Sequence, residues 1–252
     1  MPYAEYAGGF ATAVKRIATV ARKLSLSAET TDAAILWSER TGLRFDICRC
    51  IVDATELPVA QEFPVKKPLV VAWLGEVRAE KGSAILPAII ERVLAKAKSA
   101  EVKFLLQGSG RTSRKARTFD AQIEKFGDLI ERLPHGLDPN NYTATLERSN
   151  IILLPYDPTC YPPTRGSGIA VEALLTAKPM VATRGTFAGS LITCGNGVIG
   201  SDVEELSAGI LQILLNYQEF HAASLRAREK ALVDYDLLST YRRMSGLREQ
   251  HQ

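Results

Sequence analysis

Residues 68–98 read PLVVAWLGEVRAEKGSAILPAIIERVLAKAK, and this stretch indicates the fold of most of the chain. It begins with an unbroken apolar run over 69–74, which is typical of a strand buried on both faces. A polar turn containing a glycine follows, and after it apolar residues recur at helical spacing. A buried strand, a turn and an amphipathic helix in this order predict one β-α unit of an α/β protein.

The same pattern recurs along the rest of the chain. The strands that it predicts are 69–74, 102–107, 128–133, 150–155 and 179–183. The helices that it predicts are 83–98, 113–126, 140–148, 168–177 and 203–215. Right-handed crossovers between such units build a parallel sheet with helices on both faces, so we expect a doubly wound, Rossmann-like α/β domain.

The first 67 residues predict a smaller unit. We expect a helix over 10–24, a strand near 24–28, a helix capped by Thr31 or Asp32 that ends near Gly42, and a strand over 45–52. These elements make one partial βαβ unit, and residues 53–67, with two prolines and a lysine pair, have the composition of a linker. The expected division is therefore 1–67 for this unit and its linker, 68–235 for the Rossmann-like domain, and 236–252 for a C-terminal helix.

Composition and charge exclude several classes of protein. The 252 residues are 46% hydrophobic and 23% charged, which excludes collagen, coiled coils and disordered tails. The net charge of +3 gives no general electrostatic reason to bind nucleic acid or an anionic membrane. Four cations within 111–117 fit a peripheral contact with acidic lipid, but a solvated helix start explains them more simply. We therefore expect a small-molecule partner and no nucleic acid.

Cysteine and histidine usage predicts the compartment and argues against a metal site. Four cysteines in a chain of this length do not form a disulfide framework, and no Cys-x-x-Cys pair has metal-ligand spacing. The N-terminus lacks an apolar run of signal-peptide length, and no later run approaches 18 apolar residues. The expectation is a soluble cytoplasmic protein without a bound metal.

The turn after the first predicted strand of the large domain is a candidate anion site. It runs from Gly75 to Ser83 and places Arg78 and Lys81 just before a helix. Two cations and the free N–H groups of a helix start bind phosphate well. The order Lys-Gly-Ser differs from the Gly-Lys-Ser of a P-loop, so P-loop hydrolysis of ATP or GTP is disfavoured. The alternative is a solvated βα turn.

The loop after the predicted strand 150–155 is the second candidate. Ser167 is the expected N-cap of the next helix, with Gly168 beside it and Arg165 supplying a planar set of donors to phosphate. Glu172 lies one turn into that helix, where a carboxylate is suited to accept hydrogen bonds from a pair of hydroxyls, as on a ribose. Both features together suit a nucleotide; the alternative is that Glu172 only faces water.

Two weaker signals lie on neighbouring loops. The Gly108-Ser109-Gly110 turn lacks the third glycine of a dinucleotide fingerprint, because Ser113 occupies its place, so NAD binding is disfavoured. His135 follows the predicted strand 128–133 and is a lone histidine, which does not make a metal site. Its loop is expected to line the pocket for a base, mainly through main-chain groups.

The two candidate loops resemble the donor-binding C-terminal domain of GT-B glycosyltransferases, specifically glycosyltransferase family 4. Lys81-Gly82 matches a Lys-Gly turn of that family; Glu76 stands where the family has an arginine, and that role passes to Arg78. The family has a segment of two glutamates separated by seven residues. Glu172-Ala173-Leu174 matches its second, ribose-binding glutamate, whereas Thr164 stands where the family has the first, which lies near the transferred sugar. The resemblance covers residues 68–235.

The resemblance implies retaining transfer of a sugar from a nucleoside diphosphate sugar to an unidentified acceptor, without a metal or other cofactor. It assigns Arg78 and Lys81 to the leaving diphosphate as catalytic residues, and the donor-binding residues are Gly75, Arg165, Ser167, Gly168, Glu172 and His135. The family has two facing domains, so the chain is expected to be a fragment lacking most of the acceptor domain. Two alternatives stay open: a non-catalytic module that binds nucleotide sugars or a partner, and a Rossmann-like protein with an unrelated ligand.

Overall fold

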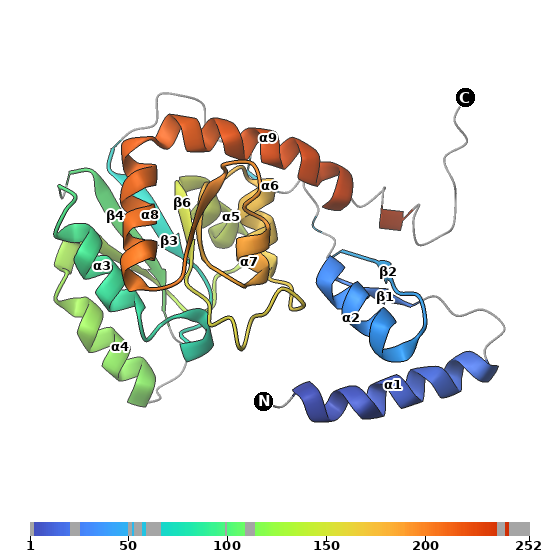
Figure 1. Ribbon diagram of the computed structural model, residues 1–252. Helices are drawn as coiled ribbons and strands as arrows, with labels where there is room; N and C mark the ends of the chain where they lie inside the picture. The colour runs from blue at the N-terminus through green and yellow to red at the C-terminus, as the bar shows by residue number, and fades with distance from the viewer. Residues whose placement is uncertain are drawn as a thin grey trace, which may run out of the picture.

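The computed structural model describes residues 3–20, 26–49, 52, 57–58, 67–98, 100–108, 114–235 and 240–241. Its larger part is a six-stranded parallel sheet with the order β5-β4-β3-β6-β7-β8 (Figure 1). The strands are β3 (Leu69–Trp73), β4 (Val102–Gln107), β5 (Ile130–Leu133), β6 (Ile151–Leu154), β7 (Met180–Thr183) and β8 (Gly197–Gly200). The helices around them are α3 (Leu86–Leu94), α4 (Arg114–Glu124), α5 (Pro139–Arg148), α6 (Gly168–Leu175), α7 (Phe187–Ser190), α8 (Val203–Leu215) and α9 (Tyr217–Tyr235). The expected Rossmann-like α/β fold is confirmed.

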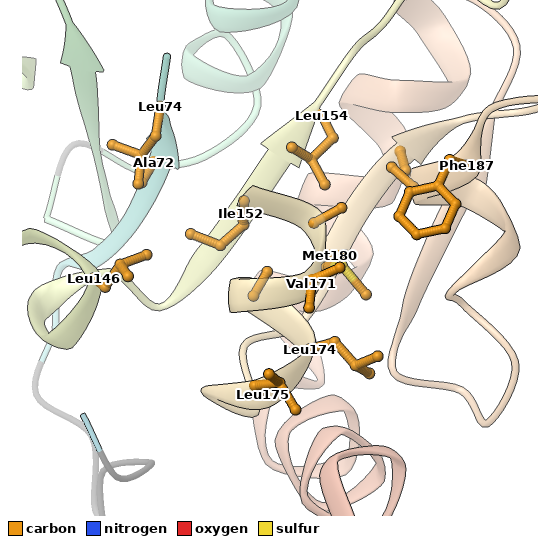
Figure 2. Close-up of a cluster of buried hydrophobic side chains, with 14 of the residues drawn as sticks. Ala72, Leu74, Leu146, Ile152, Leu154, Val171, Leu174, Leu175, Met180 and Phe187 are labelled. Carbon is orange, nitrogen blue, oxygen red and sulfur yellow. The ribbon is translucent and has the colours of Figure 1, made fainter. Parts of the chain in front are cut away.

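Two apolar layers hold the sheet between helices, because successive strand residues point to opposite faces. Val71 and Trp73 of β3 belong to one cluster, which also contains buried residues of α3, α4 and α8. Ala72 and Leu74 belong to the other, with residues of β6, β7, α6, α7 and α9. Figure 2 shows this second layer, where side chains of β6 and β7 pack against α6. Each central strand is thus buried on both sides, as its unbroken apolar run predicted.

The N-terminal unit contains α1 (Tyr3–Val20), β1 (Ser27–Ala28), α2 (Thr31–Thr41) and β2 (Asp46–Ile47), with β1 and β2 paired in parallel. The N-cap of α2 is Thr30, one residue before the expected Thr31 or Asp32, because the Thr30 hydroxyl accepts from the N–H of Ala33 at 3.1 Å. Gly42 ends the helix as expected, in the left-handed region with φ of 68°. The partial βαβ unit is confirmed.

Several boundaries differ from the sequence-based expectation. Helix α1 begins at Tyr3, so the pair Gly8-Gly9 lowers helix propensity without interrupting the helix. Helix α3 begins only at Leu86, and a 3-10 turn, η2 (Gly127–Leu129), precedes β5. Helix α7 and strand β8 were not predicted. Both have four residues and contain glycine; a Cβ on Gly197 would lie 2.2 Å from the carbonyl oxygen of Met180.

Parts of the expected division lie outside the described residues. The linker over 53–67 is described only at 57–58 and 67, and the C-terminal helix over 236–252 only at 240–241. The basic cluster over 111–117 and the residues Ser109 and Gly110 fall largely outside as well. The boundaries of the three expected segments therefore stay predictions.

Candidate functional site

The loops that follow β3 and β6 lie against each other, because these two strands are neighbours in the centre of the sheet. The N–H of Asp157 in the second loop donates to the carbonyl of Glu80 in the first, at 3.0 Å. Gly82 approaches Pro155 so closely that a Cβ there would lie 2.1 Å from the Pro155 carbonyl oxygen. From this strand pair the chain runs outward in opposite directions, to β4 and to β7, and α/β sheets bind ligands at such a switch point.

A cavity of about 300 Å³ lies where the two loops meet. The first loop contributes Lys81, the second contributes Tyr161 and residues 165–167, and helices α5 and α6 supply the remaining wall. The lining residues are Lys81, Tyr142, Tyr161, Arg165, Gly166, Ser167, Gly168, Ile169 and Glu172. The cavity therefore brings together five of the eight predicted site residues, namely Lys81, Arg165, Ser167, Gly168 and Glu172.

Lys81 reaches the cavity from the short 3-10 helix η1 (Ala79–Lys81). A Cβ on Gly75 would lie 2.6 Å from the Lys81 Nζ, and Gly75 has a φ of 117°, so only glycine leaves room for this ammonium without strain. Burial lowers the pKa of Lys81 below its usual value, and the nearby charge of Arg78 lowers it further. The ammonium is thus a partly desolvated cation, which interacts strongly with an anion.

The start of helix α6 forms the second positively polarised part of the wall. The Ser167 hydroxyl accepts from the N–H of Ala170 at 3.4 Å, as expected for an N-cap, and lies 3.3 Å from the Tyr156 hydroxyl. The Arg165 guanidinium stacks over the Tyr161 ring at 4.0 Å, and its Nη1 donates to the carbonyl of Cys160. These contacts fix the direction of the guanidinium beside the helix N-terminus.

Glu172 supplies an acidic group to the same cavity, one turn into α6. Its Oε2 accepts a hydrogen bond from the hydroxyl of Tyr142 on α5. Burial raises the pKa of the Glu172 carboxyl, although the hydrogen bond from Tyr142 acts in the opposite direction. Burial also raises the pKa of Tyr142, with the charge of Glu172 as the next cause. The carboxylate therefore faces the cavity and not the outer surface of the helix.

Three of the predicted site residues do not line this cavity. The Arg78 Nε donates to Glu76 Oε2 at 2.8 Å, and Arg78 also pairs with Glu80 at 3.7 Å. Gly75 acts through the space that it leaves for Lys81. His135 is exposed, and its carbonyl accepts from the amide of Gln107 at 2.8 Å. Their predicted roles toward a ligand stay predictions.

Three residues contribute to the site that the sequence did not point out. Tyr142 and Tyr161 lie in a predicted helix and a predicted loop, where nothing in the local pattern separates them from ordinary aromatics. Gln107 ends β4, and its side chain accepts from the N–H of Gly75 at 2.5 Å while donating to the His135 carbonyl. Its polar side chain at the carboxyl end of a strand was the available signal.

The arrangement can bind a ligand that carries both anionic oxygens and hydroxyl groups. Cations and the α6 N-terminus suit phosphates, and the Glu172 carboxylate suits hydroxyls. Among the described residues, no three histidine, cysteine, aspartate or glutamate side chains are grouped closely enough to hold a metal ion. In the same part of the chain, no helix has both the length and the apolar character needed to cross a membrane.

Comparison with solved structures identifies proteins that share this fold. Sucrose-phosphate synthase from Thermosynechococcus elongatus matches with a TM-score of 0.72 at 14% identity, covering 94% of this chain and 60% of its own. HepE of Anabaena, solved in complex with UDP and glucose, matches with a TM-score of 0.72 at 16% identity. The match covers 95% of this chain and 66% of HepE. TarM of S. aureus, in a complex that includes UDP, matches with a TM-score of 0.69 at 17% identity. The match covers 88% of this chain and 43% of TarM.

These identities show the fold alone, which is that of a Rossmann-like GT-B domain. No protein-family model matches the sequence, and no curated protein matches it. The chain spans 60% and 66% of the length of the first two of these solved proteins.

Proposed function

We propose that this chain is the donor-binding part of a retaining glycosyltransferase of family 4, which transfers a sugar from a nucleoside diphosphate sugar. The observation that supports it most directly is the meeting of Lys81, Arg165 and the α6 N-terminus with Glu172 in one cavity at the switch point. This combination provides for a diphosphate and for a ribose diol within a single ligand. The fold shared with HepE, whose complex contains UDP and glucose, is consistent with such a donor.

In this proposal the cations act on the leaving group. As the bond between sugar and diphosphate breaks, negative charge grows on the diphosphate, and fixed positive groups stabilise that charge more than they stabilise the bound donor. We assign this role to Lys81, Arg165 and the N–H groups of α6, which line the same cavity. Arg78 belongs to the same electrostatic environment, because its charge contributes to the lowered pKa of Lys81.

Nucleotide binding tests the proposal directly. Titration calorimetry with UDP, GDP and ADP on the wild type should detect at least one complex. Lys81→Ala and Arg165→Ala should each weaken the preferred nucleotide by about tenfold or more, the effect of one charge-assisted hydrogen bond. Lys96→Ala, at an exposed lysine after α3, is the matched control and should leave the affinity unchanged. A wild type that binds none of the three nucleotides would contradict the proposal.

The pH dependence of binding gives an independent check. Because burial lowers the pKa of Lys81, its ammonium loses its proton at a lower pH than an exposed lysine does. Affinity for the nucleotide should therefore fall as the pH rises through this lowered pKa, and the Lys81→Ala variant should lack that decline. An equal decline in both proteins would assign it to another group.

A second candidate function is a nucleotide-sugar-binding module without transfer. The pairing of Arg78 with Glu76 and Glu80, away from the cavity, favours it, since a catalytic arginine would have to contact the diphosphate. Release of free nucleotide from a nucleotide sugar, measured on the purified chain with wild-type and Arg78→Ala protein, separates the two. Turnover that depends on Arg78 excludes the module.

A further inference from the structure

One carboxylate of the N-terminal unit lies against a residue that lines the donor cavity. Glu29 follows the carboxyl end of β1, and its side chain lies against Gly166 in the loop before α6. A Cβ built on Gly166 would lie 2.1 Å from the Glu29 Oε1 and 2.6 Å from its Oε2. The carboxylate thus fills the space that any other side chain at position 166 would occupy.

A second contact holds the N-terminal unit beside the large domain. Arg49, just after β2, places its guanidinium 5.2 Å from the centre of the Tyr235 ring at the end of α9. Its Nη2 also lies 3.6 Å from the Asp234 carboxylate. Glu29 is near this contact as well, since its charge is one of the smaller causes of the raised pKa of Tyr235, whose main cause is burial. Two separate points therefore define where Glu29 sits.

The position of Glu29 relative to the cavity determines which part of a ligand it can meet. Gly166 lines the cavity and precedes the N-cap Ser167, whereas Glu172 lies one turn beyond that cap. A diphosphate at the helix start would lie between them. A carboxylate repels phosphate but accepts hydrogen bonds from hydroxyls, so Glu29 suits a hydroxyl-bearing group beyond the diphosphate on the side opposite the nucleoside.

We infer that Glu29 is a specificity-determining residue for the donor sugar, accepting hydrogen bonds from its hydroxyl groups, and that position 166 is a glycine because it must admit this carboxylate. This inference rests on the proposed function. It extends the site to a residue of the N-terminal unit, 137 positions before Gly166 in the chain. The side chain of Glu29 is exposed, so Glu29→Ala leaves no cavity in a buried core.

The test compares a nucleotide with its sugar-bearing form. Calorimetry gives Kd for UDP and for UDP-glucose, UDP-galactose and UDP-N-acetylglucosamine, or for the GDP or ADP equivalents where the wild type prefers those bases. The informative quantity is the ratio of the Kd of the tightest nucleotide sugar to that of the bare nucleotide. Glu29→Ala should raise this ratio by about tenfold, the effect of a hydrogen bond to a charged acceptor. Glu39→Ala, at an exposed glutamate of α2, should leave it unchanged.

Gly166→Ala provides a second route to the same result. Its methyl group has to displace the carboxylate, which is the flexible end of a side chain, so the ratio should rise as in Glu29→Ala. In the double variant the two effects should not add, because both remove the same contact.

Each outcome has one meaning. An unchanged ratio in Glu29→Ala, or an equal loss of affinity for nucleotide and nucleotide sugar, overturns the inference and leaves the proposed function intact. A wild type that binds its nucleotide sugars no more tightly than the bare nucleotide also overturns it. A wild type that binds no nucleotide at all overturns the proposed function itself.

Discussion

The large sheet domain and the N-terminal unit are both built from parallel βαβ connections, yet they differ greatly in how much they bury. Six strands of four to six residues form the sheet, and most of their side chains are inaccessible to solvent. The N-terminal unit has two strands of two residues each. Among the residues of this unit whose burial is described, the buried apolar side chains are Val14, Ala33, Ala34 and Phe45.

This difference indicates that the two parts are stabilised in different ways. A doubly wound sheet with two apolar layers has its own core, whereas a two-stranded sheet with one small layer is marginal in water without support from neighbouring structure. The contacts of Glu29 with Gly166 and of Arg49 with Tyr235 provide such support. The N-terminal unit should therefore respond to mutation and to ligand more readily than the sheet.

The largest expected effect on stability comes from replacing a buried phenylalanine by alanine, and it should differ between the sheet domain and the N-terminal unit. Phe104→Ala in β4 removes a ring that is 1% exposed, and we expect a loss of about 4 kcal/mol in the free energy of unfolding. Phe45→Ala should instead open the N-terminal unit while the sheet domain keeps its urea midpoint. Urea denaturation and amide hydrogen exchange measure the two effects. A matching loss of midpoint in both variants would show that the parts unfold as one.

A buried lysine of the sheet domain gives the next effect, and it depends on pH. Burial lowers the pKa of Lys178 to about 8, and its Nζ donates to the Glu147 carbonyl at 3.0 Å. Between pH 8 and pH 10.5, the unfolded chain keeps a proton on this lysine that the folded chain has lost. The free energy of unfolding therefore rises with pH across this range, and the increase is lost again as the pH falls to 8.

Lys178→Met should remove this rise, which amounts to as much as about 3 kcal/mol. Urea denaturation at pH 8 and pH 10 measures it. Lys15→Met, at an exposed lysine of α1, should retain the wild-type slope. An unchanged slope in the Lys178 variant would mean that this lysine stays protonated in the fold.

The smallest expected effects compare two helix caps of the same kind. Thr30→Ala and Ser167→Ala each remove a hydroxyl that accepts from a helix N–H, at a cost of about 1 kcal/mol. Thermal unfolding should show similar losses. Nucleotide affinity should fall only in the Ser167 variant, because only that cap lines the cavity. A fall in both would extend the nucleotide site to α2.

The sequence predicted the elements of the large domain well where a single physical signal was strong. Strands β3, β6 and β7 were found because burial on both faces requires an unbroken apolar run, and β4 was found from the shorter run Phe104–Leu106. Strand β8 was missed because glycines at 197 and 200 shorten that run, and their purpose, close approach to neighbouring backbone, lies in tertiary structure. The three helix ends that were predicted from a named capping residue were accurate to one residue, at Thr30, Gly42 and Ser167.

The site was predictable to the extent that it follows from topology. Loops at the carboxyl ends of parallel strands meet at one edge, so Lys81, Arg165 and Glu172 were expected together and lie together. The hydrogen bond from Tyr142 to Glu172 joins residues 30 positions apart on two helices. It was not predictable from the sequence, because it depends on how those helices pack. Arg78 pairs with Glu76 and Glu80, which follows from the turn geometry of η1 and was not visible in the residue types alone.

The main-chain bond from Asp157 to Glu80 and the close approach of Gly82 to Pro155 have a thermodynamic consequence for ligand capture. They make the two loops a single preorganised wall, so a ligand does not have to immobilise them and loses less entropy on arrival.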